Sequence, residues 1–369
     1  MKKRLLKTKA ILFFVCVLMV SESAQAQWQA EWERVLEAAR KEGKLVLNIP
    51  PSADLRKALE ENLRQKFGIE LEVVMANSAP AVKRVGDEFK AGVRYFDVIT
   101  STWDSLSYSL LPAGAVEPLE QLWILPEVKD AKNWWGGHIW TDAAKKYAYS
   151  PYAYLMDNIW YNTRQAKPEE MRLYEDLLNP KWKGKLGLWD PRAGGAAIGI
   201  WGYLWLTKGE SFLRKLVQQN LVVLQDRRLL ADSLARDKIA IAIGATYYSY
   251  AAFMKAGLPI KAFPPFKEGT FVSVGNGGPV AIKNAPHPNA AKVFINWILS
   301  KEGQQVYGKA FGQATRRLDV DTTWMTDIGI RPAKDNITIE QFYQGQNALE
   351  ETNVKVRRPA EEFAQKILP

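Results

Sequence analysis

The chain has few of the residues from which many enzyme sites and covalent cross-links are built. Among 369 residues there are one cysteine, Cys16, and two histidines, His138 and His287. Two histidines give no plausible Ser-His-Asp arrangement, and neither zinc-ligand spacing nor a phosphate-binding glycine loop is found. A lone cysteine excludes an internal disulfide, so a hydrophobic core must hold the chain together, as its length allows. Carboxylates are plentiful, which leaves a hydrolase of the two-acid kind open.

Long hydrophobic runs are also scarce, and the one near the start of the chain is short. Ala10–Val20 is an apolar run of 11 residues behind five Lys or Arg side chains, about half of the ~20 residues that a membrane-spanning helix needs. Ala24-Gln25-Ala26 then gives the small-x-small pattern of a cleavage site. We expect residues 1–26 to be a signal peptide cleaved after Ala26, and the mature protein to reside in the periplasm. The alternative is a retained membrane anchor, which would need a longer apolar run.

The basic excess is modest once the signal is removed. The signal carries five of the 50 Lys and Arg residues and one of the 40 Asp and Glu residues, so the remaining chain has a net charge of +6. Its basic side chains are dispersed, without a run longer than two. This pattern indicates ordinary surface solvation, and we expect no nucleic-acid partner.

About 340 residues after the signal are too many for one compact core, so two domains are expected. Helices and short apolar strands alternate in both halves, which predicts an α/β fold with mostly parallel sheets flanked by helices. In the first half we expect helices at 28–42, 52–67 and 82–91 and strands at 45–49, 71–75 and 96–100. In the second half we expect strands at 185–189 and 239–244 and helices at 194–206 and about 247–256.

Two extended segments predict how the halves are joined. Residues 149–162 pass into the second region, and residues 271–283 return from it. We expect one lobe at 27–147 plus 277–325, a second at 148–276, and a polar helical segment at 326–369 that wraps the surface. A cleft between two such lobes would lie beyond the carboxyl ends of the strands, where ligands bind to open α/β sheets.

Four motifs carry a family resemblance. Residues 286–304 read PHPNAAKVFINWILSKEGQ, which predicts an amphipathic helix that starts at Pro288 and ends between Ser300 and Gly303. A further helical piece can begin at 304–310. The residue order of 286–304 resembles the late helix of extracellular solute-binding proteins of ABC importers. NPKWKGK at 179–185 followed by DPR at 190–192, LPAGA at 111–115 and RRLDV at 316–320 are similar to motifs of the iron(III)-type members.

The resemblance implies a two-lobed, type II-like periplasmic fold that closes by hinge motion about a small-molecule or metal solute. It implies a receptor without enzymatic activity and without a required cofactor, which delivers its solute to an ABC permease in the inner membrane. We expect a monomer. Relatives bind ferric iron, sugar phosphates, polyamines, thiamine and other polar solutes, so the resemblance leaves the solute open.

Tyr247 and Tyr248 are the clearest chemical signal. They follow the strand at 239–244, where ferric-binding relatives carry a tyrosine pair that ligates iron. Phenolate oxygen suits Fe³⁺, whose charge offsets the cost of deprotonating a group with a pKa of ~10. The resemblance thus suggests both tyrosines as metal ligands and Fe³⁺ as cargo. The alternative is that they line an apolar pocket or pack between the lobes. The ferric pattern is also incomplete, because Pro50-Pro51-Ser52 stands where some relatives carry a His or Glu.

The segment at 190–195 predicts a different chemistry. It joins a strand to a helix, so free N–H groups at the helix start suit an anion, and Arg192 can add a two-pronged contact to it. The alternative is a tight turn with a surface arginine, whose entry is fixed by Pro191. An anionic organic solute is therefore the main rival to iron, and an organic cation or sugar-like solute stacked on aromatic residues also stays open. So does a receptor that feeds a sensor protein. The expected ligand-binding residues are Ser52, Ser101, Thr102, Trp103, Tyr152, Asp190, Arg192, Gly194, Gly195, Tyr247 and Tyr248.

Overall fold

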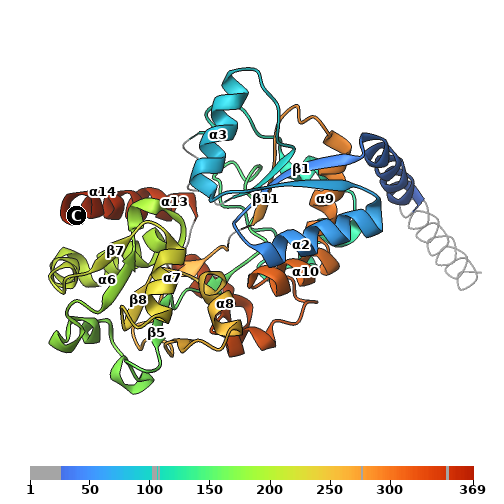
Figure 1. Cartoon of the computed structure of the whole chain (residues 1–369). Helices are drawn as coiled ribbons and strands as arrows, with labels where there is room; N and C mark the ends of the chain where they lie inside the picture. Colours follow the sequence, from blue (N-terminus) through green and yellow to red (C-terminus); the bar gives the residue numbers. More distant parts are fainter. Residues whose placement is uncertain (1–25, 102–105, 107–108, 276, 346–348) are drawn as a thin grey trace, which may run out of the picture.

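A computed structural model describes residues 26–369 apart from 102–105, 107–108, 276 and 346–348. It contains a four-stranded sheet of order β11-β3-β1-β2, a five-stranded sheet of order β7-β6-β8-β5-β9 and a three-stranded sheet of order β10-β4-β12. Figure 1 shows α2, α9 and α10 around the first of these sheets and α6, α7 and α8 around the second. We call the bodies built on these two sheets the first and second lobe. The α/β fold expected from the sequence is confirmed.

The first lobe contains the predicted alternation of helices and strands. β1 (Lys44–Ile49) pairs in parallel with β2 (Glu70–Met75) and β3 (Val98–Ser101), and β11 (Gly278–Ala281) pairs antiparallel to β3. A helix at 26–42 precedes β1. α2 (Ala53–Asn62) follows β1, and α3 (Ser78–Lys90) follows β2. A π-helical turn, Leu63–Phe67, extends α2. In β1 only Lys44 is not buried, as expected for a strand covered on both faces.

The segment at 286–304 forms one helix that ends at Leu299 and the first turn of another, in agreement with the predicted end near Ser300. α9 spans Pro288–Leu299 and α10 spans Lys301–Phe311. The Ser300 hydroxyl caps α10 by accepting from the Gly303 N–H at 3.2 Å, which explains the break. Ahead of α9, the N–H and Nδ1 of His287 lie 2.7 and 2.9 Å from the buried Asp97 carboxylate. These contacts give His287 a structural role at the start of α9.

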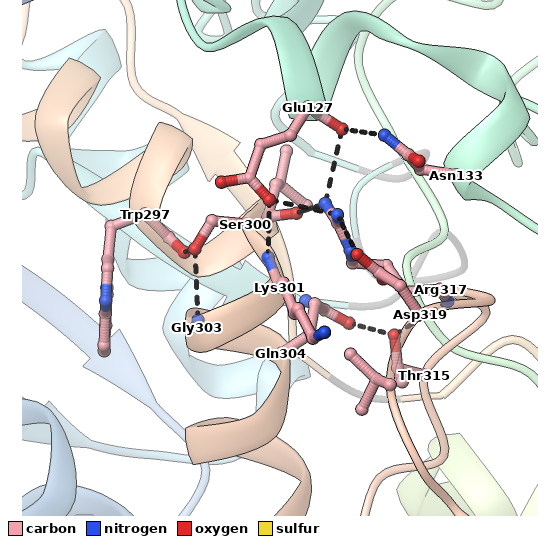
Figure 2. A network of polar contacts seen from close by, with 12 residues as sticks. Glu127, Asn133, Trp297, Ser300, Lys301, Gly303, Gln304, Thr315, Arg317 and Asp319 are labelled. Atoms are coloured by element: carbon pink, nitrogen blue, oxygen red, sulfur yellow. Dashed lines mark hydrogen bonds and ion pairs between the residues drawn. The ribbon is translucent and has the colours of Figure 1, made fainter.

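An arginine network ties α9 to the segments that pack beside it (Figure 2). Arg317 is 1% exposed and donates to the Leu299 carbonyl oxygen at the end of α9, at 3.1 Å. It pairs with both oxygens of Asp319, each at 2.8 Å, and with Glu127 of α5 (Pro126–Lys129) at 3.0 Å. The motif at 316–320 therefore serves the packing of the first lobe.

The second lobe combines parallel and antiparallel strands. β6 (Leu186–Trp189), β7 (Val222–Leu224) and β8 (Ile241–Ile243) run parallel, whereas β5 (Ile159–Asn162) pairs antiparallel with β8 and with β9 (Ile260–Ala262). The helices are α6 (Gly195–Val217), kinked at Gly209, α7 (Arg227–Ala235) and α8 (Tyr247–Lys255).

The third sheet lies where the two predicted crossings meet. β4 (Tyr154–Leu155) pairs antiparallel with β10 (Val272–Ser273) and with β12 (Arg331–Pro332). The 3-10 helix Thr323–Ile328 leads into β12. The sequence predicted two crossing segments, and the structure adds a third.

The C-terminal segment is helical, as predicted, but it is more than a surface wrap. It contains α11 (Ala333–Asn336), α12 (Ile339–Gln344), α13 (Glu350–Thr352), a π-helical turn Asn353–Arg357 and α14 (Arg358–Ile367). Phe342, Ala360 and Ala364 are 0% exposed and belong to the core of the second lobe. The indole N–H of Trp201 in α6 donates to the Ala360 carbonyl oxygen at 3.0 Å. The surface prediction is wrong for this inner face. Within the described part of the chain, no helix has the length and hydropathy to cross a bilayer.

Candidate functional site

Three helices of the second lobe begin at one edge of its sheet. Because β6, β7 and β8 run parallel, the helices α6, α7 and α8 that follow them start beside one another at the carboxyl ends of these strands. Each start presents N–H groups without intrahelical partners and the positive end of a helix dipole. This edge therefore suits a negatively charged group.

The loop after β1 in the first lobe faces this edge, and the start of α2 contacts the other end of α8. Nη2 of Arg227 in α7 lies 3.5 Å from the Pro51 carbonyl oxygen. Nζ of Lys255 in α8 lies 2.5 Å from Oδ2 of Asp54 in α2. We call the region between these elements the interlobe site. It comprises Pro51, Ser52, Gly194, Gly195, Arg227, Tyr247 and Tyr248.

Arg227 is a buried cation at the start of α7. The residue is 6% exposed, and its guanidinium carbon lies 4.5 Å from the centroid of the Tyr248 ring. No ion pair joins it to an Asp or Glu among the residues that the structure describes. The helix dipole at this position opposes a positive charge. Because a buried charge without a counter-ion is costly, the site favours an anion beside Arg227.

The two adjacent tyrosines face different neighbours. Tyr248 stacks on Phe311 of α10 with ring centroids 4.4 Å apart. Tyr247 lines a cavity of about 10 Å³ together with Asp157, Thr246 and Gly312. The described residues contain no group of three or more His, Cys, Asp or Glu side chains placed to hold a metal. Metal ligation by Tyr247 and Tyr248 stays a prediction.

The start of α8 contains two buried hydroxyl groups without hydrogen-bond partners in the described structure. Thr246 is the N-cap residue but makes no side-chain capping bond, and it is 4% exposed. Ser249, in the first turn, is 7% exposed. The oxygens of both hydroxyl groups lack a partner. Buried hydroxyls normally find one, so they can donate to a solute or water at this helix end.

The predicted role of Arg192 is corrected by its contacts. Its Nε and Nη2 atoms donate to the two oxygens of the buried Asp190 carboxylate at 2.8 and 2.7 Å. Nη2 also donates to the carbonyl oxygen of Pro369 at 2.8 Å. Hydrogen bonding to Asp190 raises the pKa of the Arg192 guanidinium. The two-pronged contact expected for a ligand is thus already made to Asp190, and both residues serve the turn before α6.

Tyr152 is a further correction. Its side chain is 0% exposed and stacks on Tyr307 with ring centroids 5.2 Å apart. Burial raises the pKa of its phenol well above the ordinary value. The ring is therefore part of the core rather than the cleft wall that the sequence predicted.

The remaining predicted residues are placed as follows. The Ser52 hydroxyl caps α2 by accepting from the Leu55 N–H at 3.2 Å. Gly194 and Gly195 have φ of 79° and 62°, a left-handed backbone that favours glycine at the entry to α6. Ser101 ends β3. Thr102 and Trp103 lie outside the described residues.

Arg227 is the residue that sequence reasoning missed. In the sequence it stands in the pair Arg227-Arg228, which is typical of a solvated surface. The available signal was Asp226, which caps α7 by accepting from the Arg228 N–H at 2.6 Å and is separated from the short apolar segment at 221–224 by Gln225 alone. This pattern places Arg227 at the carboxyl end of a strand.

Comparisons with known proteins bear on the family and the fold of the chain. Residues 45–312 match the family model described as bacterial extracellular solute-binding protein. An uncharacterised protein of Haemophilus influenzae is 30% identical over 145 residues, which are 38% of this chain and 41% of that relative. The matched part thus spans less than half of the relative's length.

The matches to solved structures of similar fold extend over nearly the whole of those structures' chains. Iron-bound HitA from Pseudomonas aeruginosa matches with a TM-score of 0.66 and 16% identity, over 88% of this chain and 99% of its own. AfuA from Actinobacillus pleuropneumoniae, a periplasmic binding protein with fructose-6-phosphate bound, matches with a TM-score of 0.61 and 20% identity, over 88% and 98%. FutA from Trichodesmium, in complex with iron and citrate, matches with a TM-score of 0.59 and 18% identity, over 88% and 99%. At these identities the likeness shows the fold.

Proposed function

Because the chain belongs to the bacterial extracellular solute-binding proteins, we propose that it captures a small solute between its two lobes and delivers it to an ABC permease in the inner membrane. In this proposal residues 1–26 direct export to the periplasm, and the mature protein works there as a monomer without catalysis. The lobes comprise residues 27–147 with 277–325 and residues 148–276, and residues 326–369 pack on the second lobe. Hinge closure then buries the solute.

We further propose that the solute is anionic. The observation that carries this proposal is Arg227, a buried cation at a positive helix end without a carboxylate partner among the described residues. A solute carboxylate or phosphate would supply the missing counter-charge, and the starts of α6 and α8 would supply N–H and hydroxyl donors. AfuA, which has a similar fold, holds a sugar phosphate.

Ferric iron is the second candidate, favoured by Tyr247 and Tyr248 at the start of α8. The phenols would have to turn toward one point, because their rings now face different neighbours. Arg227 beside Tyr248 opposes a trivalent cation unless an anion binds with it. HitA and FutA, both of similar fold, hold iron, and FutA holds citrate as well.

The test is native mass spectrometry of protein purified from its periplasm, followed by calorimetric titration with fructose-6-phosphate, citrate and ferric citrate. We expect an organic anion to co-purify and one of the anions to bind. Arg227→Gln should weaken that binding about 10- to 100-fold, a loss of about 1.4–2.8 kcal/mol. The matched control is Arg228→Gln, because Arg228 is the exposed neighbour on the same helix; it should change affinity less than twofold.

A different outcome identifies iron. A visible tyrosinate–iron absorption band that forms without any organic anion and disappears in Tyr247→Phe would overturn the anionic proposal. Turnover of a bound compound would overturn the receptor proposal in favour of a hydrolase.

A further inference from the structure

A second cavity lies apart from the interlobe site, against α10. It has a volume of about 480 Å³, within the range of about 300–1,000 Å³ that is typical of small-molecule sites. We call it the α10 cavity. It is lined by Gln304, Gln305, Gly308, Lys309, Gln313, Thr315, Val320, Asp321, Thr322, Trp324 and Met325. It shares no residue with the interlobe site.

The floor of the α10 cavity is polar and fixed. Gln304 and Thr315 are 0% and 1% exposed, and the Thr315 hydroxyl donates to Oε1 of Gln304 at 2.6 Å (Figure 2). Nε2 of Gln304 donates to the Ile298 carbonyl oxygen at 2.7 Å. Gln313, also lining the cavity, is 0% exposed. Because these side chains are held by their own hydrogen bonds, the floor is organised before a ligand arrives.

The mouth of the cavity carries two opposite charges that are not paired with each other. Lys309 and Asp321 are both exposed and both line the cavity, yet no ion pair joins them in the described structure. Oδ1 of Asp321 accepts from the N–H and the hydroxyl of Thr323 at 2.9 and 2.7 Å. These bonds, helped by the charges of Lys334 and Lys309, hold the pKa of Asp321 below its usual range. Asp321 is thus anionic at neutral pH.

One wall of the α10 cavity is aromatic. Trp324 is partly buried and packs against the core of the second lobe, whereas Tyr307 and Phe311 of α10 belong to the core of the first. The cavity therefore lies where the two cores adjoin. An indole face beside a cation-binding carboxylate attracts an ammonium group or an apolar side chain.

We propose that the α10 cavity binds a small zwitterion of the free amino-acid class. The ligand's carboxylate pairs with Lys309, its ammonium group pairs with Asp321, and its side chain lies against Trp324 above the amide floor. A ligand with a single charge pairs with only one of Lys309 and Asp321, and the other side chain then carries a charge of the same sign as the ligand. A zwitterion satisfies both.

Saturation-transfer NMR with each common free L-amino acid in turn, starting with L-glutamine, tests the proposal on the full mature chain. At least one amino acid should bind. Its carboxamide and its N-acetyl derivative, which each lack one charge, should bind at least tenfold more weakly. Lys309→Gln and Asp321→Asn should each weaken binding about tenfold, while Lys301→Gln, an exposed lysine of the same helix outside the cavity, should not.

The interlobe variant separates this site from the proposed function. Arg227→Gln should leave amino-acid binding unchanged, and fructose-6-phosphate or citrate should not compete for it. The proposal is overturned if no amino acid binds, if the singly charged derivatives bind as tightly as the parent, or if Arg227→Gln abolishes the binding.

Discussion

At the scale of single residues, Arg317 shows how a buried cation is satisfied in this protein. It is 1% exposed, but its partners Asp319 and Glu127 retain 36% and 43% of their side-chain exposure. Arg317→Leu would remove the donor to the Leu299 carbonyl oxygen and both ion pairs, so we expect a loss of about 2–4 kcal/mol in the free energy of unfolding. Asp319→Asn should cost less than about 1 kcal/mol, since Glu127 still pairs. Urea denaturation measures both, and equal losses would contradict the argument.

The same network predicts a pH dependence. Hydrogen bonding to Arg317 holds the pKa of Asp319 below its usual range in the folded state. A depressed folded pKa contributes stability above the unfolded pKa of ~3.9, and that contribution is lost as the pH falls through the folded value. Denaturation midpoints followed from pH 6 to pH 2 should therefore decline more steeply below pH 4 in the parent than in Asp319→Asn. Parallel declines would show that the pair is not coupled to folding.

Gly312 gives a second residue-scale prediction. It ends α10 with φ of 67°, and a Cβ there would collide with the Tyr247 ring. Gly184 has φ of 73° but nothing within 4 Å of such a Cβ. Gly184→Ala should therefore cost only the left-handed strain, about 1–2 kcal/mol. Gly312→Ala should cost about 1–3 kcal/mol more, because overpacking is added. Thermal denaturation distinguishes the two; equal losses would mean that Tyr247 moves away freely.

At the scale of elements, the start of α9 depends on a carboxylate far away in the sequence. Glu42 accepts from the N–H groups of Asn289 and Ala290 at 3.2 and 2.8 Å, so it acts as an N-cap supplied by another helix. Glu42→Gln should lower the free energy of unfolding by about 1 kcal/mol, since an anion at a helix start is lost. Glu37→Gln, an exposed position of the same helix, should be neutral in urea denaturation. A neutral Glu42→Gln would show that Pro288 alone is enough to start α9.

Sequence reasoning succeeded for elements whose pattern is local and failed where the partner is distant. The helices and strands predicted between residues 28 and 100 of the first lobe follow from apolar periodicity, and each was found within a few residues of its predicted bounds. The short helices between residues 119 and 133 were not predicted. Two-residue strands such as β4 and β12 have no periodicity to read, because only their pairing defines them. The sequence of α14 is largely polar, yet its face with Ala360 and Ala364 is buried against α6.

The site was predicted less completely than the fold, for a related reason. Strand order placed the loops near Pro51 and Tyr247 on the facing edges. It did not tell which charged side chain would be left without a counter-ion. Arg192 and Arg227 look equivalent in sequence, but Asp190 neutralises the first, and no described carboxylate neutralises the second. That difference is set by tertiary contacts.

At the scale of the whole molecule, the polar contacts between the starts of α2 and α7 and the end of α8 are weak, and the Tyr248–Phe311 stack is the apolar contact described between the lobes. The Lys255–Asp54 pair is exposed by 64% and 63%, so it contributes about 0–1 kcal/mol and is screened by salt. The Arg227 contact with Pro51, at 3.5 Å, is long. Under the proposed function, closure therefore depends on the solute that joins Arg227 to the first lobe, and the free protein should open.

This argument predicts the response of molecular size to ligand. In small-angle X-ray scattering, the radius of gyration of the parent should fall when the bound anion is added, because a solute that prefers the closed form shifts the population toward it. Lys255→Gln should become compact at nearly the same concentration, since its ion pair is weak. Arg227→Gln should stay open at that concentration and close only when the ligand is raised about 10- to 100-fold, in step with its weaker binding. If Lys255→Gln lost closure while Arg227→Gln kept it, the exposed ion pair rather than the solute would hold the lobes together.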